Sequence, residues 1–139
     1  PHEALDPLRR ATAMTNAEPL IASLFGHALI ATEDDGNFEE AERVLRAAVG
    51  RDRRNPFAWY QLGVVYAARG DTARARLASA EQQVMNRQYG LALRSAQAAE
   101  YGLEHGTPDW IRAQDIGMQA RALLERQCEM ERGRDCAPG

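Results

Sequence analysis

The chain has 139 residues, enough for one domain with a hydrophobic core of its own. Its formal net charge is −3 at pH 7, from 17 basic and 20 acidic residues, so composition gives no electrostatic case for a nucleic-acid partner. No apolar run approaches the ~18 residues that suggest a membrane span. Abundant Ala, Leu, Glu and Arg, without alternating β-branched runs, predict an all-α domain of about seven helices over residues 1–139.

The N-terminal helix is predicted over residues 1–16. His2 and Glu3 begin a stretch that invites comparison with H-E-x-x-H, in which two histidines one helical turn apart hold zinc. Asp6 stands where the second histidine is needed, and the other two histidines have no ligand spacing to the first. We interpret His2 and Glu3 as exposed residues without a metal. The chain begins without a methionine or a secretory leader, and we expect it to be a segment of a longer protein.

The next two helices are predicted over residues 17–32 and 38–50, separated by the breaker at residues 33–36. Their inward positions recur at helical spacing and are Ile21, Leu24, Phe25 and Ala28, then Phe38, Ala41, Leu45 and Ala48.

The clearest motif lies in a helix predicted over residues 55–70. Trp59, Leu62, Gly63 and Tyr66 fall at i, i+3, i+4 and i+7, which places them in one stripe. A glycine inside this apolar stripe costs about 1 kcal/mol of helix propensity. We therefore expect another helix to come so close to Gly63 that no side chain fits there.

Spacing around this motif indicates a repeat. Gly36 and Gly70 are 34 positions apart (70 − 36), as are Ala41 and Ala75. The segment from Gly26 to Gly36 is about three residues longer than the corresponding segment from Gly63 to Gly70. We place that insertion in the first turn, at residues 33–35, because loops tolerate extra length.

The C-terminal half is predicted to contain three more helices. Residues 72–86 have apolar positions on two faces, so we expect this helix to lie between two neighbours and to belong to two helix pairs at once. Residues 89–99 form the following helix. A Thr-Pro-Asp start then predicts a terminal helix at 107–131 that caps the array, followed by a tail at 132–139.

The central motif resembles the tetratricopeptide repeat (TPR). Its W-x2-L-G-x2-Y pattern, with a small residue in the second helix, is matched by Trp59, Leu62, Gly63, Tyr66 and Ala75. The resemblance implies a right-handed superhelix of antiparallel helix pairs, with about three units over residues 17–106. Neighbouring units are required because one repeat cannot bury its own apolar face.

A narrower resemblance covers residues 52–116. The run Pro-Asp-Trp-Ile-Arg-Ala-Gln-Asp at 108–115, together with Asn-Pro-Phe-Ala-Trp at 55–59, is similar to bacterial periplasmic zinc metalloproteases with a C-terminal TPR domain. One departure is Arg87-Gln88, where the family usually has Gly-Asp.

The narrower resemblance implies a division of labour within a longer protein. The catalytic domain, its H-E-x-x-H helix and its zinc would lie upstream of Pro1, so this chain would be non-catalytic and without a cofactor. It would act in the periplasm, in quality control of envelope and outer-membrane proteins. Its partners would be proteins or peptides, including its own protease domain and envelope proteins.

The partner-binding face is predicted on the concave side of the array, which the first helix of each unit lines in this fold. The predicted residues are Leu20, Ser23, His27, Ile30, Phe57, Tyr60, Val64, Ala67, Arg74, Leu77, Glu81 and Val84. This lining is apolar with a few polar points and suits an extended or helical segment. It lacks a Lys and Arg cluster for a C-terminal carboxylate. For Phe57 and Tyr60 the alternative is packing against a neighbouring helix.

The only two cysteines are Cys128 and Cys136. In an oxidising periplasm they would form a disulfide that pins the tail, and the alternative is a pair of free thiols. Two cysteines without nearby ligands do not predict a zinc site.

Three functions remain open from the sequence. The first is the non-catalytic interaction domain of an envelope metalloprotease, and the second is a free-standing TPR adaptor or scaffold. The third is an enzyme in its own right, which the lack of an acid–base or metal motif disfavours. An H-E-x-x-H motif upstream of Pro1 in the full reading frame would separate the first from the second.

Overall fold

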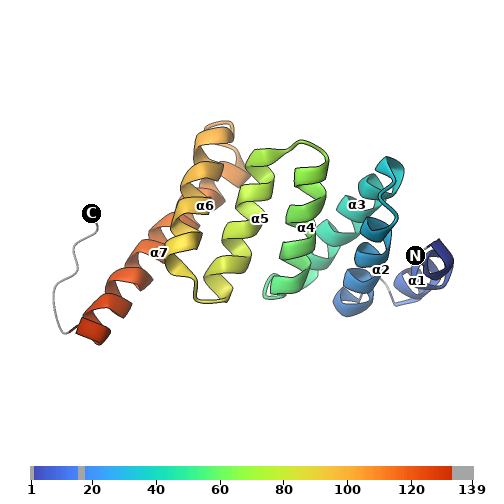
Figure 1. Cartoon of the computed structure of the whole chain (residues 1–139), viewed down its shortest axis with the longest axis horizontal. Coiled ribbons are helices and arrows are strands. Elements are labelled where there is room, and N and C mark those ends of the chain that lie inside the picture. The colour runs from blue at the N-terminus through green and yellow to red at the C-terminus, as the bar shows by residue number, and fades with distance from the viewer. Residues whose placement is uncertain (1, 16–17, 133–139) are drawn as a thin grey trace.

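The computed structural model describes residues 2–15 and 18–132, and all regular structure in these ranges is helical (Figure 1). The predicted all-α class with seven α-helices is confirmed for this part of the chain. After a short 3-10 helix, η1 (His2–Ala4), the helices are α1 (Leu5–Met14), α2 (Pro19–Ala31), α3 (Asp35–Arg51), α4 (Pro56–Ala68), α5 (Thr72–Met85), α6 (Tyr89–Gly102) and α7 (Pro108–Arg132).

Each α-helix packs on the next one along the chain, and two further contacts set how the array is built. α4 packs on α2 as well as on α3, whereas α7 packs on α5 as well as on α6. In Figure 1, α2, α4, α5 and α6 stand side by side, and α3 and α7 run behind them. The α4–α5 pair therefore has one face toward α3 and α7 and an opposite face that these two helices leave uncovered.

α5 contributes to two hydrophobic cores. Ala78 belongs to the core that α5 shares with α1, α2, α3 and α4. Leu77 and Ala80 belong to a second core, formed with α6 and α7. A helix between two cores must bury apolar residues on two sides, which accounts for the two apolar faces in the sequence of residues 72–86.

The motif in α4 is buried. Trp59, Leu62 and Tyr66 lie in the first core, and the Trp59 indole N–H donates a 2.8 Å hydrogen bond to the carbonyl oxygen of Arg53. α4 begins where the Asn55 side chain accepts a hydrogen bond from the backbone of the third helical residue. Burying two aromatic rings in one stripe fixes the face that α4 turns toward α3 and α5.

The predicted insertion in the first turn is wrong. α3 begins directly after its N-cap Asp34, and Gly36 lies in the first turn of the helix. Asp34 corresponds to the N-cap Asp71 of α5, 37 positions later (71 − 34). The left-handed residue between α2 and α3 is Glu33, whereas Gly70 has that role before α5. Because α3 has 17 residues and α5 has 14, the three extra residues lie within α3.

A side chain is excluded at Gly26 and not at Gly63. A Cβ atom at Gly63 would lie 3.6 Å from the Cβ of Ala78, an ordinary van der Waals distance, so the expectation that no side chain fits there is corrected. A Cβ at Gly26 would lie only 2.7 Å from Cδ2 of Leu45, which is fully buried. Position 26 of α2 therefore requires glycine.

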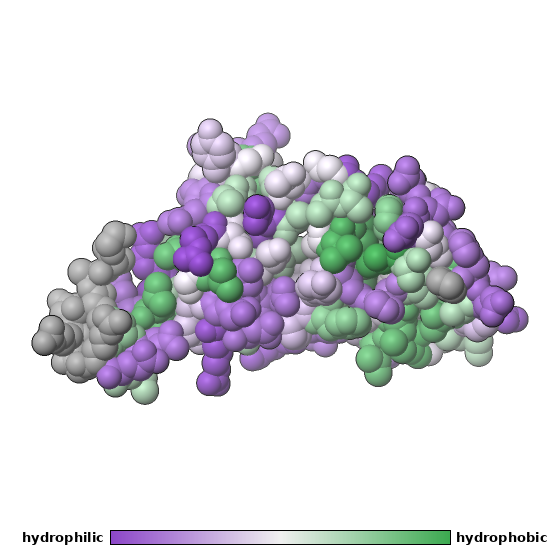
Figure 2. Space-filling view, viewed as in Figure 1, coloured by the Kyte–Doolittle hydropathy of each residue, from purple (hydrophilic) through white to green (hydrophobic). Residues whose placement is uncertain are grey.

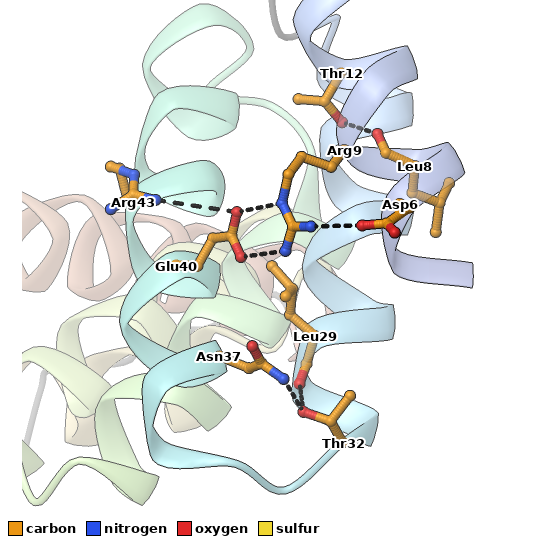
Figure 3. Close-up of polar contacts among 9 residues, drawn as sticks. All are labelled: Asp6, Leu8, Arg9, Thr12, Leu29, Thr32, Asn37, Glu40 and Arg43. Carbon is orange, nitrogen blue, oxygen red and sulfur yellow. Dashed lines mark hydrogen bonds and ion pairs between the residues drawn. The ribbon is translucent and has the colours of Figure 1, made fainter. Parts of the chain in front are cut away.

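The salt bridges of Arg9 attach α1 to the rest of the array (Figure 3). Its guanidinium donates hydrogen bonds of 2.9 and 2.8 Å to the two carboxylate oxygens of Glu40 on α3, and one of 2.9 Å to Asp6. The hydrogen bond from Arg9 lowers the pKa of the Glu40 carboxyl below its ordinary value. The same guanidinium lies 5.4 Å from the centre of the Phe25 ring of α2, so one side chain contacts two helices.

In the turn between α5 and α6 the backbone is strained at Arg87. The metalloprotease family that this region resembles usually has glycine at this position. Arg87 has φ = +61°, its N–H donates to the carbonyl of Val84, and the N–H of Gln88 donates to the carbonyl of Gln83. This pair of hydrogen bonds is a Schellman motif, whose left-handed position favours glycine.

Alanine substitutions at the two glycines should have opposite effects. Gly26→Ala should lower the free energy of unfolding by about 1–3 kcal/mol, because the buried Leu45 must repack. Gly63→Ala should raise it by up to about 1 kcal/mol, because the methyl group fits and alanine favours the helix. Urea denaturation of both variants measures this difference, and an equal or reversed pair of effects would contradict the geometry.

Arg87→Gly should stabilise the protein by about 0.5–1 kcal/mol, because it removes the cost of a left-handed side-chain-bearing residue. The control is Arg94→Gly within α6, which should cost about 1 kcal/mol of helix propensity. Thermal melts of the two variants should move in opposite directions. Destabilisation by both would show that the turn does not hold Arg87 in the left-handed region.

Candidate functional site

A buried carboxylate joins three segments on the face of the α4–α5 pair that lies toward α3 and α7. Glu81 of α5 is only 1% exposed. Arg112 of α7 forms a bidentate pair with it, donating at 2.7 Å to Oε1 and at 3.0 Å to Oε2. Arg53, from the segment between α3 and α4, donates to Oε2 at 3.0 Å. Hydrogen bonding to Glu81 raises the pKa of the Arg112 guanidinium, which favours its charged form.

A cavity of about 340 Å³ opens beside this carboxylate, with walls from α3 and α7 and a floor from α4 and α5. We call it the arginine groove, because Arg46, Arg53, Arg74 and Arg112 all line it. Its lining contains two carboxylates, Glu81 and Asp109, and two more carboxylates outside the lining pair with its arginines, Asp71 with Arg74 at 3.4 Å and Glu42 with Arg46 at 3.7 Å. The four arginine side chains are 37–56% exposed, so their guanidinium groups remain accessible from solvent.

The arginine groove is not predicted by the sequence pattern, because its four arginines come from α3, the α3–α4 segment, α5 and α7. The one local signal was Glu81, a carboxylate at a position between the apolar residues Leu77 and Val84 of a packed helix. A buried acid of this kind requires basic partners from elsewhere in the chain.

Exposed apolar side chains gather on the other side of the array. Leu20 and Leu24 of α2 and Phe57 and Tyr60 of α4 are large apolar residues that are 46–63% exposed, so the expectation that Leu24 faces inward is wrong. The His27 ring lies 6.2 Å from the Phe57 ring, so the two helices present these residues together. Figure 2 shows apolar surface over α2 and the adjoining side of α4. We call Leu20, Leu24, Phe57 and Tyr60 the apolar face.

A second cavity of about 340 Å³ continues the apolar face between α4 and α5. Tyr60, Val64 and Ala67 line it from α4, and Ala75, Ser79 and other residues line it from α5. The predicted α4 residues Tyr60, Val64 and Ala67 therefore line one cavity.

The predicted lining is not one continuous surface, and this expectation is corrected. Arg74, Leu77 and Glu81 of α5 line the arginine groove, on the opposite side of the α4–α5 pair from Tyr60. The reason is that α5 packs with α7 on one side, whereas α4 packs with α2 on the other. Val84 is half-buried and packs against the second core.

Three of the twelve predicted contact residues are buried, so the prediction that they contact a partner is corrected, and they have structural roles. Ser23 is fully buried and accepts a 3.4 Å hydrogen bond from the Asn55 side chain, which links α2 to the start of α4. Leu77 packs in the second core, and Glu81 is the carboxylate that binds two arginines. Ile30 is half-buried against the first core, whereas His27 and Ala67 are exposed.

The described residues contain no cluster of three or more His, Cys, Asp or Glu side chains placed to hold a metal ion. His2 and Glu3 are exposed in η1. None of the helices in these ranges is both long and apolar enough to cross a membrane. Cys128 lies in α7 and is not free, but Cys136 lies outside the described residues, so their pairing stays a prediction.

Comparison of the chain with protein-family models, with curated proteins and with solved structures finds no match.

Proposed function

We propose that this chain is a non-catalytic protein-interaction domain of the TPR type. The observation that carries the proposal is the apolar face, where Leu20 and Tyr60 are more than half exposed on neighbouring helices. Grouped apolar side chains of this kind mark protein-interaction surfaces in soluble proteins.

The shape of the surface favours a polypeptide partner over a small molecule. The cavity beside Tyr60 is an open groove between α4 and α5, and α2, with its exposed Leu20 and Leu24, packs on α4. An extended or helical segment can lie along such a groove and place side chains on Phe57 and Tyr60. Both of these residues are on α4, whose other side is fixed in the first core, so the surface is preorganised.

A finer proposal is that the chain is the C-terminal partner- or substrate-binding module of a periplasmic zinc metalloprotease. The resemblance of residues 108–115 to that family supports it, and two charged residues of this run pair with α5. Arg112 binds Glu81, and Asp109 accepts a 3.1 Å hydrogen bond from Arg74. The zinc and the catalytic residues would belong to an upstream domain, and the partners would be that domain and envelope proteins.

The alternative is a free-standing TPR adaptor. Zinc content and peptidase activity of the protein encoded by the full reading frame separate the two proposals. Bound zinc with peptide hydrolysis supports the metalloprotease, and their absence together with an intact interaction surface supports the adaptor.

Photocrosslinking at Tyr60 tests the interaction function. A benzophenone amino acid placed at Tyr60 should form adducts with a defined partner in cells, whereas the same group at Tyr101 of α6, which is 95% exposed, should not. Tyr60→Ala should weaken capture of that partner and change the free energy of unfolding by no more than about 0.5 kcal/mol, as is usual at the surface. Equal adducts from both positions, or a strongly destabilised Tyr60→Ala variant, would refute this role.

A further inference from the structure

A third cavity, of about 570 Å³, adjoins the Glu81 ion pairs. Its walls come from the segment between α3 and α4, from α5 and the turn into α6, and from α7. Arg53, Arg54, Arg87 and Arg112 line it, and Glu81 is the one carboxylate among the described residues of its lining. We call it the Arg54–Arg87 cavity, after the two arginines that distinguish it from the arginine groove.

Two of these four guanidinium groups have no carboxylate partner. Arg53 and Arg112 both donate to Glu81. In contrast, no carboxylate in residues 2–15 and 18–132 lies within ion-pair distance of Arg54 or Arg87, and both side chains are exposed. The first turn of α6, which follows Arg87, contains no acidic residue either. The charge of these two arginines is therefore not neutralised by the part of the chain that the structure describes.

Two other carboxylates lie close in sequence but do not compete for these arginines. Asp52 accepts a 3.1 Å hydrogen bond from the backbone N–H of Arg54, and Asp115 lies one helical turn after Arg112 on α7. Neither residue belongs to the lining of the cavity. A cavity with unpaired positive charge attracts anionic groups.

The backbone holds Arg87 at the wall of this cavity in a conformation that would suit glycine better. Arg87 has φ = +61°, and the hydrogen bonds of the turn, to the carbonyls of Val84 and Gln83, fix it there. Strained residues of this kind occur at ligand-binding positions, where the side chain is retained for its contacts.

Two unpaired positive charges in one cavity are matched by a doubly charged anion. Phosphate carries a charge of about −1.5 to −2 at neutral pH, and its oxygens suit the planar fork of a guanidinium group. A single carboxylate would neutralise only one of the two arginines. The hydroxyl of Tyr89, which also lines the cavity, supplies a neutral donor.

The cavity also has room for more than the phosphate itself. Val84, Met85 and Leu123 form an apolar part of its lining. The organic portion of a phosphate monoester can lie against these side chains while its phosphate binds the arginines.

We propose that the Arg54–Arg87 cavity binds a phosphate group, either as inorganic phosphate or as a small phosphate monoester, through the guanidinium groups of Arg54 and Arg87. The inference does not rest on the interaction function. Arg54 lies just before α4 and Arg87 lies before α6, so a phosphate bound to both joins two parts of the array and stabilises the folded chain.

Thermal melts of the whole chain test for this stabilisation. At constant pH and ionic strength, replacing chloride by about 50 mM phosphate should raise the melting temperature by at least about 3 °C more in the parent than in Arg54→Gln combined with Arg87→Gln. The comparison with the variant is essential, because phosphate also stabilises proteins generally by exclusion from their surface.

Calorimetric titration with inorganic phosphate measures the affinity directly. Arg54→Gln combined with Arg87→Gln should raise the Kd by at least about tenfold. The control is Arg10→Gln combined with Arg94→Gln, which removes the same charge from exposed positions outside the cavity and should leave the Kd within about twofold. An equal rise in the control, or an unchanged Kd in the cavity variant, would overturn the inference.

Arg87→Gly separates loss of the site from loss of the fold. This variant should melt at a higher temperature than the parent in phosphate-free buffer, because glycine relieves the left-handed strain, and yet bind phosphate at least about tenfold more weakly. Retention of the parent Kd by Arg87→Gly would contradict the proposed site.

Phenyl phosphate and benzoate identify the ligand chemistry. Tighter binding of phenyl phosphate than of inorganic phosphate assigns a monoester to the site, and equal or weaker binding assigns inorganic phosphate. Benzoate has the same ring with a single carboxylate and should bind at least about tenfold more weakly than phenyl phosphate. Equal affinity for these two aromatic anions would overturn the preference for phosphate.

Discussion

The structure depends on how α5 is held between two hydrophobic cores. Its apolar residues pack on α4 on one side and on α6 and α7 on the other. At the point where these contacts meet, Glu81 places a carboxylate in the interior. Burial of a lone carboxylate would cost several kcal/mol, and two arginines from distant parts of the chain offset that cost. The ion pairs therefore fix how the C-terminal helices sit against the N-terminal ones.

Two surfaces follow from this arrangement. α2 packs on α4 and presents the apolar face, whereas α3 and α7 border the arginine groove on the other side of the α4–α5 pair. One surface is apolar and exposed, and the other has paired arginines and carboxylates over an apolar floor. The α4–α5 pair separates these two surfaces.

Sequence reasoning succeeded where the signal is local. Trp59, Leu62 and Tyr66 of α4 are expected in one stripe because they repeat at helical spacing, and the structure buries that stripe. The position of the inserted residues was wrong because Gly36 was equated with Gly70. The N-caps Asp34 and Asp71 mark the equivalent helix starts, and their spacing assigns the extra residues to α3.

The features that sequence missed are those that several segments build together. Gly26 and Gly63 are alike in sequence context, and only the size of the facing residue, Leu45 or Ala78, decides which glycine is required. The arginine groove combines side chains from four segments, so no window of the sequence contains it. The predicted partner-binding residues lie on two separate surfaces for the same reason. The helices that pack on α5 determine which of its faces is covered.

A double-mutant cycle between Glu81 and Arg112 tests most directly whether this ion pair joins the two parts of the array. The free energies of unfolding of Glu81→Gln, Arg112→Gln and the double variant should show a coupling of at least about 1 kcal/mol, as expected for residues in one salt-bridge network. The control cycle between Glu40 and Arg112, which share no partner, should be additive within about 0.5 kcal/mol. A Glu81–Arg112 coupling as small as the control would contradict the account.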